Sequence, residues 1–190
     1  MTQRMLALTL IAYLFLVLGY LNIARLNYAP DEPWHYLYVR HLADGKGLPT
    51  AETTHQAQHP PLYYAIGAVW VRLARLFLGE QPPQTAFADG IQYTYFAGEE
   101  YALRFLSALF GVGAILTVYA LACRVAPGDP WVQCVAPALL AFTPLFTYMT
   151  SVVNNDALLV LLVAVLLSQT AAYLQTGDER RLAAAGLALG

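Results

Sequence analysis

Charged residues are scarce in this chain, and their scarcity sets its broad class. Lysine, arginine, aspartate and glutamate together make up 12% of the 190 residues, whereas hydrophobic residues make up 58% and the mean hydropathy is +0.50. Soluble domains carry about 25% charged and about 45–50% apolar residues. The composition therefore excludes an ordinary soluble domain and predicts an integral membrane protein.

Basic clusters, cysteine frameworks and glycine-rich phosphate loops are also lacking. The net charge is −2 and no run of lysine and arginine occurs, so nothing indicates nucleic-acid binding. The two cysteines, Cys123 and Cys134, have neither zinc-site spacing nor a disulfide framework, and we interpret them as small buried hydrophobic side chains. Without a glycine-rich loop, no nucleotide-binding fold is predicted.

Long apolar runs, by contrast, are abundant. Met5–Ile23 has no charged residue and is long enough, at about 1.5 Å per residue, to cross a hydrocarbon layer of about 30 Å. Arg4 precedes it and no signal-peptide cleavage site is evident, so we expect an uncleaved anchor with a cytoplasmic N-terminus. Because a fifth apolar run is incomplete at Gly190, we expect a piece of a longer chain. Membrane spans are predicted at 5–24, 102–123, 131–150 and 157–175, with the start of a fifth at 182.

The segment Pro60–Gly79 is harder to interpret. It is long enough to span, but it carries Arg72 and Arg75, and each arginine at mid-helix costs about 2.5–3.5 kcal/mol. Its aliphatic residues recur at helical spacing on another face. These residues are Leu62, Ile66, Val69, Leu73 and Leu76. The amphipathic stripe predicts a helix over about 60–79 that lies in the membrane interface.

This flat helix fixes the predicted topology. With it, residues 25–100 form one external loop, in which the aromatic stretch 91–101 is interpreted as an interfacial belt. Arg124 and the pair Arg180–Arg181 then fall on the cytoplasmic side with Arg4, as the positive-inside rule prefers. A spanning helix would place these arginines outside, so we favour the flat helix.

Unusual polar residues then gather at the external ends of the predicted spans, and each also has a structural explanation. The pair Asp31–Glu32, between two prolines, is typical of the start of a capped helix. Arg104 can pair with Glu100 one turn away, although an arginine inside a bilayer more often lines a functional cavity. His59 can be an ordinary interfacial side chain, and Asn154–Asp156 can cap the next helix.

Four motifs in order carry a resemblance to a known family. The apolar anchor is followed by "PDEPWHY", "HPPLYY", "ALRFLSALFG" and "TPLFTYMTSVVNND". This order resembles the GT-C superfamily of polyprenyl-phosphate-sugar-dependent glycosyltransferases, and most closely its protein O-mannosyltransferases and lipid A aminoarabinose transferases. The resemblance covers nearly the whole chain but only the N-terminal part of the family's transmembrane module. It implies an all-α polytopic fold whose external loop carries juxtamembrane helices.

The resemblance also implies roles for individual residues. Asp31 matches the catalytic carboxylate of the family's first external loop, and Glu32 matches its acidic neighbour. His59, before the proline pair, and Arg104, which opens the next span, match positions that serve the carrier phosphate. Asn155–Asp156 matches a second acidic site at the outer end of a span.

The implied reaction moves a sugar from a polyprenyl-phosphate carrier to a lipid, glycan or protein acceptor at the external membrane face. Arg104 and a protonated His59 would stabilise the leaving phosphate, while Asp31 acts as general base on the acceptor hydroxyl, with inversion at the anomeric carbon. Asp31 and Asp156 could instead share a divalent cation, Mg or Mn, through oxygen ligands. The expected location is a bacterial inner or plasma membrane.

Two other function classes are compatible with a membrane protein of this composition. A transporter or flippase-like protein would place charges nearer mid-membrane and repeat broken helices between two halves, and no internal repeat is evident here. A non-catalytic membrane scaffold subunit would tolerate Asp31→Asn, Arg104→Ala and Asp156→Asn. Neither class explains why the polar groups gather at one face, so a membrane glycosyltransferase is the first hypothesis.

Overall fold

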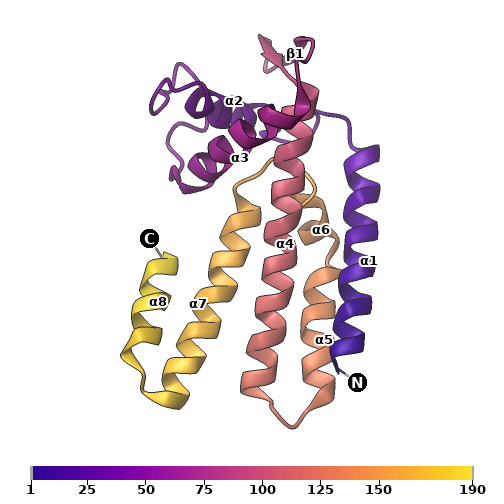
Figure 1. The fold of residues 1–190 in the computed structure, drawn as a ribbon, viewed down its shortest axis with the longest axis vertical. Helices are drawn as coiled ribbons and strands as arrows, with labels where there is room; N and C mark the ends of the chain where they lie inside the picture. Colours follow the sequence, from indigo (N-terminus) through magenta and orange to yellow (C-terminus); the bar gives the residue numbers. More distant parts are fainter. Residues whose placement is uncertain (1, 190) are drawn as a thin grey trace. The chain divides into compact units, whose positions relative to one another are not determined.

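A computed structural model describes residues 2–189 of the chain as eight helices and one β-hairpin (Figure 1). The predicted all-α, polytopic membrane fold is confirmed, with the small hairpin as its one departure among the described residues. The helices are α1 (Thr2–Ile23), α2 (Glu32–Ala43), α3 (Leu62–Leu78), α4 (Ala97–Val125), α5 (Pro130–Ala141), α6 (Pro144–Met149), α7 (Asp156–Thr176) and α8 (Glu179–Leu189), and the strands are β1 (Gln84–Ala88) and β2 (Ile91–Tyr95).

Three of the described helices are long and apolar enough to cross a membrane. They are α1, α4 and α7, with 22, 29 and 21 residues. α4 begins at Ala97, ahead of the predicted span at 102, and its first turn contains Glu99 and Glu100. Acidic residues in the first turn interact favourably with the positive end of the helix dipole, which explains why the helix extends beyond its apolar run.

The predicted span over 131–150 is divided in the structure. α5 ends at Ala141 and α6 begins at Pro144, so Phe142 and Thr143 interrupt the helix. Thr143 has an extended backbone, with φ −68° and ψ 115°. Because proline disfavours the helical conformation of the residue before it and has no N–H to donate, Pro144 ends one helix and starts the next.

The chain divides into two compact units, which are described separately. Unit 1 comprises Met1–Leu18, Ala108–Thr150 and Asp156–Gly190, and unit 2 comprises Gly19–Ser107 and Ser151–Asn155. The helices α1 and α4 each contribute residues to both units. Most of the residues predicted to act in the site belong to unit 2.

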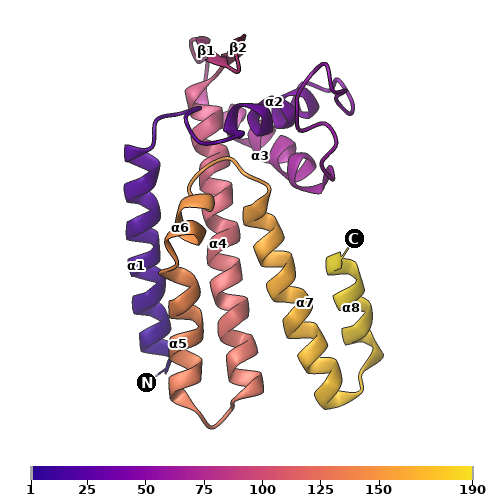
Figure 2. The same ribbon diagram turned by 180° about the vertical axis from the view of Figure 1, so that it is seen from behind.

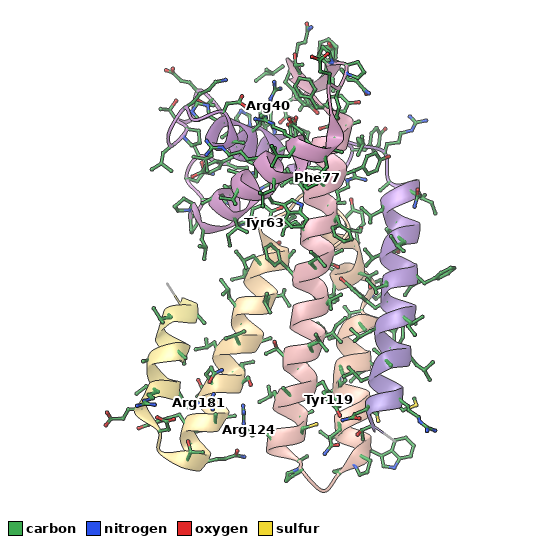
Figure 3. The ribbon with its side chains drawn as sticks, in the orientation of Figure 1. Arg40, Tyr63, Phe77, Tyr119, Arg124 and Arg181 are labelled. Atoms are coloured by element: carbon green, nitrogen blue, oxygen red, sulfur yellow. The ribbon has the colours of Figure 1, made fainter. Side chains whose placement is uncertain are left out.

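Unit 1 is a bundle of apolar helices. The turn between α4 and α5 and the turn between α7 and α8 lie at the end where α1 begins (Figures 1 and 2). At this end the Tyr119 hydroxyl donates to the Thr2 hydroxyl at 3.3 Å, and Arg124 Nη1 donates to the Ser168 carbonyl at 2.9 Å (Figure 3). The topology prediction assigns these turns to one side of the membrane, and which side they occupy stays a prediction.

In unit 2, α2 and α3 pack on each other and on the first turns of α4 around a core of tyrosines and aliphatic residues. The rings of Tyr38 and Tyr64 stack with centroids 3.7 Å apart. Gly67 lets the helices approach closely, because a Cβ there would lie 3.0 Å from Val39 Cγ2 and 3.2 Å from Leu103 Cδ2. The core is therefore built from all three helices.

The helix α3 lies where the amphipathic pattern predicts one, and its arginines have local partners. Arg72 Nε donates to the Ala43 carbonyl at 2.7 Å, at the C-terminal end of α2. Arg75 Nη2 donates to Asp44 at 3.0 Å, beside the same helix end. Arginines near a helix C-terminus satisfy its free carbonyls and interact favourably with the dipole. The amphipathy of α3 thus separates an arginine face that holds α2 from an exposed apolar face.

The hairpin β1–β2 is a feature that the aromatic-belt interpretation misses. Its antiparallel register pairs Ala88 with Ile91, so that Asp89 and Gly90 form a two-residue turn. Both turn residues have positive φ, 49° and 78°, as a tight Asp-Gly hairpin turn requires. The alternating tyrosines that follow are therefore strand residues.

Candidate active site

Asp31 lies at the start of α2 with its carboxylate exposed. Its backbone carbonyl accepts hydrogen bonds from the N–H groups of Trp34 and His35, both at 3.0 Å. Its side chain makes no capping hydrogen bond, and it forms no ion pair with any residue that the structure describes. The capping explanation of this aspartate is wrong, and the carboxylate is left accessible.

The backbone of Asp31 explains why its side chain does not cap the helix. Its φ of 59° and ψ of −3° lie in the left-handed region, whereas a capping residue has an extended backbone. Aspartate tolerates this conformation better than most residues. Strain of about 1–3 kcal/mol at such a residue persists where the surrounding structure enforces it, and such residues cluster at functional sites. The conformation therefore favours a functional role for Asp31.

Glu32, the next residue, has the opposite environment. Its carboxylate and the Arg104 guanidinium are completely buried and form a bidentate ion pair, with Nε–Oε1 at 2.8 Å and Nη2–Oε2 at 2.7 Å. The N–H of Val153 donates to Glu32 Oε1 at 2.9 Å. Arg104 also donates to the carbonyls of Ala24 and Arg25, at 2.8 and 3.0 Å. The pair thus joins the start of α2 to α4, to the chain that follows α1 and to the segment 151–155.

This ion pair bears on two predicted roles. Glu32 has no exposed surface, and the Nε, Nη1 and Nη2 atoms of Arg104 all have partners. A catalytic Glu32, or an Arg104 that binds the carrier phosphate, would require the pair to open. In the arrangement observed, both residues hold the backbone that carries Asp31. The predicted pairing of Arg104 with Glu100 is present only as a longer contact of 3.9 Å.

Further polar atoms surround the buried pair. Glu100 Oε1 accepts the Asn27 N–H at 2.8 Å. Glu100 Oε2 and the Tyr93 hydroxyl are buried without a hydrogen-bond partner among the described residues. Burial and the nearby carboxylates of Glu100 and Glu32 raise the pKa of the Tyr93 hydroxyl, so this group stays protonated and can donate. Buried polar atoms are nearly always paired, so this region is suited to polar ligands or water.

Two histidines lie side by side in unit 2. His59 is partly exposed, and its Nδ1 lies 3.3 Å from the Asn155 amide nitrogen, so the structure brings these two predicted residues together. The ring of His35 lies edge-on to that of His59, with centroids 5.9 Å apart. His35 Nδ1 contacts the Tyr64 hydroxyl at 2.8 Å. Burial, and to a lesser extent His59, lower the pKa of His35 to about 4, so its imidazole is neutral at physiological pH.

Asp156 begins α7 and belongs to unit 1, whereas Asp31 belongs to unit 2. Within residues 2–189, no three His, Cys, Asp or Glu side chains are grouped so that they could hold a metal ion. The divalent cation shared by Asp31 and Asp156 therefore stays a prediction.

An apolar groove lies between α3 and the first turns of α4. It has a volume of about 670 Å³, and its walls include Trp70, Phe77, Tyr101 and Phe105. Phe77 is labelled in Figure 3. The Trp70 indole N–H donates to the Ala102 carbonyl at 2.8 Å, which fixes the ring in the wall. A groove of this size and chemistry is suited to a hydrocarbon chain.

Sequence reasoning misses His35, Tyr64 and the Val153 N–H as parts of this site. His35 lies one helical turn after Asp31, and that spacing is a signal that the sequence offers. Tyr64 is the last residue of the motif "HPPLYY", which contains His59 and the proline pair. The Val153 contact joins residues 121 positions apart through a backbone group, and no side-chain pattern indicates it.

Comparison with known proteins adds one finding. A family model described as dolichyl-phosphate-mannose-protein mannosyltransferase matches residues 80–190, more than half of the chain. The matched range includes Arg104 and Asn155–Asp156 and begins after Asp31, Glu32 and His59. No curated protein and no solved structure matches the chain.

Proposed function

Because this chain belongs to the dolichyl-phosphate-mannose-protein mannosyltransferase family, we propose that it moves a sugar from a polyprenyl-phosphate carrier to an acceptor hydroxyl at the external membrane face. Membership and the apolar helices establish the coarser part, an integral membrane glycosyltransferase of the mannosyltransferase type that uses a lipid-linked sugar. The carrier, the face and the stereochemistry belong to the proposal. The observation that carries it is the exposed Asp31, held in a strained conformation beside the buried Glu32–Arg104 pair.

Asp31 is the general base in this proposal. An accessible carboxylate can accept the proton of an acceptor hydroxyl while the hydroxyl oxygen attacks the anomeric carbon. The bond between that carbon and the phosphate oxygen breaks, and the polyprenyl phosphate leaves with the electron pair. Attack from the face opposite the phosphate inverts the anomeric configuration. Glu32 and Arg104 act as positioning residues, because they fix the backbone on which Asp31 is carried.

The leaving phosphate requires a positively charged or hydrogen-bonding partner. His59 fits this role, because it is partly exposed and in contact with Asn155, whereas Arg104 is completely buried. The groove between α3 and α4 supports a lipid-linked donor, because its aromatic and aliphatic walls can hold part of an isoprenoid chain. Asp156 stays a candidate for a second acidic site or a cation ligand.

The substitution Asp31→Asn tests the proposal. Loss of a general base typically costs about 10²–10⁴-fold in rate. Asparagine also tolerates the left-handed backbone, so the fold should not change. Membranes carrying each variant would be incubated with radiolabelled polyprenyl-phosphate mannose, and label transferred to the membrane acceptors would be counted.

The matched control is Asp89→Asn, which changes another exposed aspartate with a positive φ, in the hairpin turn. We expect Asp31→Asn to lose at least 100-fold in transfer rate and Asp89→Asn to keep the wild-type rate. Transfer by Asp31→Asn within a few-fold of the wild-type rate would remove Asp31 from the chemistry, and with it the reaction proposed here.

A further inference from the structure

Basic residues in unit 2 gather at the C-terminal end of α2, at the opposite end of that helix from Asp31. Four of the ten lysines and arginines of the chain meet there, and two carboxylates pair with them. The basic residues are Arg40, Lys46, Arg72 and Arg75, and the acidic residues are Asp44 and Glu99. This corner has a local charge of +2 in a chain whose net charge is −2.

The carboxylates do not neutralise these cations one by one. Asp44 is shared among Arg75 Nη2 at 3.0 Å, Lys46 Nζ at 3.5 Å and Arg40 Nε at 3.9 Å. Glu99 pairs with Arg75 at 2.8 Å, so it brings no charge to the other cations. Arg72 donates to main-chain carbonyls at the end of α2. The positive charges of Arg40 and Lys46 are therefore only partly neutralised.

A small pocket opens among these side chains. It has a volume of about 240 Å³, and its lining includes Arg40, His41, Asp44, Lys46, Thr53 and Thr94. The pocket is thus too small for a drug-sized ligand, which needs at least about 300 Å³. It has room for one oxyanion with a small substituent.

Arg40 is fixed in place with a donor unused. Its Nη1 donates to the Thr94 carbonyl at 2.6 Å, and its guanidinium lies 4.5 Å from the centroid of the Phe96 ring. Its Nε is buried and has no hydrogen-bond partner among residues 2–189. Lys46 lies in a turn between Gly45 and Gly47, whose φ values are 76° and 80°, and 60% of its side chain is exposed.

We propose that this pocket, the α2 pocket, binds a phosphate group. A guanidinium held rigidly, an ammonium and the Thr53 hydroxyl provide donors from different directions, and they suit an oxyanion with several acceptor oxygens. The excess positive charge supplies the attraction. The site is distinct from the candidate active site, because nine residues of helix separate Arg40 from Asp31, which is about 14 Å. A donor phosphate that leaves from the reacting carbon cannot lie so far from the base.

Two sources could supply the phosphate, an anionic phospholipid headgroup and a water-soluble phosphate ester. The exposed apolar face of α3 favours the lipid, because Leu73, Leu76 and Phe77 are 50%, 76% and 88% exposed on a helix that the sequence places in the membrane interface. Each basic residue near an anionic membrane surface also strengthens attraction to it. We therefore expect the headgroup of an anionic phospholipid to occupy the α2 pocket.

Isothermal titration calorimetry on the whole chain in a neutral detergent tests this inference. The titrants are dihexanoyl phosphatidylglycerol, dihexanoyl phosphatidylcholine and glycerol 3-phosphate. The variants are Lys46→Gln and Arg40→Gln, and the matched control is Arg180→Gln, which removes one charge from an exposed position on α8. Lys46→Gln is the decisive variant, because Arg40 also holds the Thr94 carbonyl and its loss can disturb the hairpin.

We expect saturable binding of phosphatidylglycerol that weakens about tenfold in Lys46→Gln and stays unchanged in Arg180→Gln. Equal loss of glycerol 3-phosphate binding would assign the site to soluble phosphate esters, whereas loss confined to phosphatidylglycerol would assign it to lipid. No saturable binding of either phosphate compound, or binding that Lys46→Gln leaves unchanged, would overturn the proposal. Binding of phosphatidylcholine with equal strength would do the same, because excess positive charge should discriminate against a zwitterionic headgroup.

Discussion

The buried Glu32–Arg104 pair makes a prediction about stability that can be worked out from its surroundings. Replacing Arg104 with methionine keeps a long side chain but removes the only charge among residues 2–189 that neutralises Glu32 at bonding distance. It leaves the Glu32 carboxylate with the Val153 N–H, and it takes a donor from the carbonyls of Ala24 and Arg25. Removing one partner of a buried ion pair costs about 3–5 kcal/mol, so the unfolded fraction should rise at least about 100-fold.

The assay is reversible unfolding in mixed micelles, followed by helical circular dichroism. The double variant Glu32→Met/Arg104→Met serves as the internal control, because it removes both charges and replaces them with apolar side chains. Such double replacements are often close to neutral, so the double variant should be more stable than Arg104→Met alone. A double-mutant cycle then gives the coupling energy of the pair. Arg180→Met, on the exposed face of α8, controls for loss of one arginine.

The result that would refute this reasoning is a loss of transfer without a loss of stability. If Arg104→Met unfolds like the wild type but transfers sugar slowly, and if the defect lies in the KM for the carrier, Arg104 contacts the substrate. The role inferred from family resemblance, binding of the carrier phosphate, would then replace the positioning role. A large loss of stability that Glu32→Met partly restores would support the positioning role.

Two further predictions concern unit 2. The folded state lowers the pKa of His35 from 6.5 to about 4, so between these pH values the unfolded chain binds a proton that the folded chain does not. The free energy of unfolding is therefore highest above about pH 6.5 and falls by about 3 kcal/mol as the pH falls from there to about 4. His35→Gln, which keeps a partner for Tyr64, should flatten the free energy of unfolding against pH over that range, and an unchanged slope would show that His35 is not the group responsible. Gly67→Ala should destabilise the fold by about 1–3 kcal/mol, because its Cβ would lie 3.0 Å from Val39 Cγ2, whereas Gly19→Ala, with no atom within 4 Å, should not. Equal stability of the two alanine variants in thermal unfolding would contradict the close packing of α2, α3 and α4.

Elements with a strong local pattern could be predicted from the sequence. The helices α1 and α7 have apolar runs of spanning length, and the structure places them within a few residues of the predicted spans. The amphipathic period of α3 predicts both the helix and the separation of its arginines from its apolar face. In these cases neighbouring residues alone determine the structure, so a local pattern is sufficient.

The predictions for two segments were wrong, because in each a short turn or helix-breaking motif lies within a longer compositional pattern. In the segment 131–150, overall hydropathy masks the effect of Pro144, which ends one helix and begins another. In the segment 84–95, the aromatic content masks the Asp89–Gly90 turn, which is a strong hairpin signal between alternating residues. Both motifs are local, so turn and proline residues, taken before composition, predict the helix break and the hairpin.

The sequence indicates which polar residues of the candidate site are unusual, but it does not indicate which of them contact one another. The sequence identifies Asp31, Glu32 and Arg104 as unusual, yet it gives no means of telling which carboxylate Arg104 contacts. Glu32 and Arg104 are 72 positions apart, and Glu100, one turn from Arg104, is the obvious local partner. Only the packing of α2 on α4 decides that Glu32 makes the close contact.

The different environments of Asp31 and Glu32 have a physical cause at the start of α2. Consecutive residues of a helix point about 100° apart, so the side chains of Asp31 and Glu32 leave the start of α2 in different directions. Glu32 has the longer side chain, and its two oxygens meet the Arg104 fork while its neighbour remains outside. With Glu32 anchored, the chain enters the helix through a left-handed residue, and aspartate is one of the few side chains that tolerate this conformation. The two acidic residues therefore act together, because the buried Glu32 carboxylate fixes the position and the backbone conformation of the exposed Asp31.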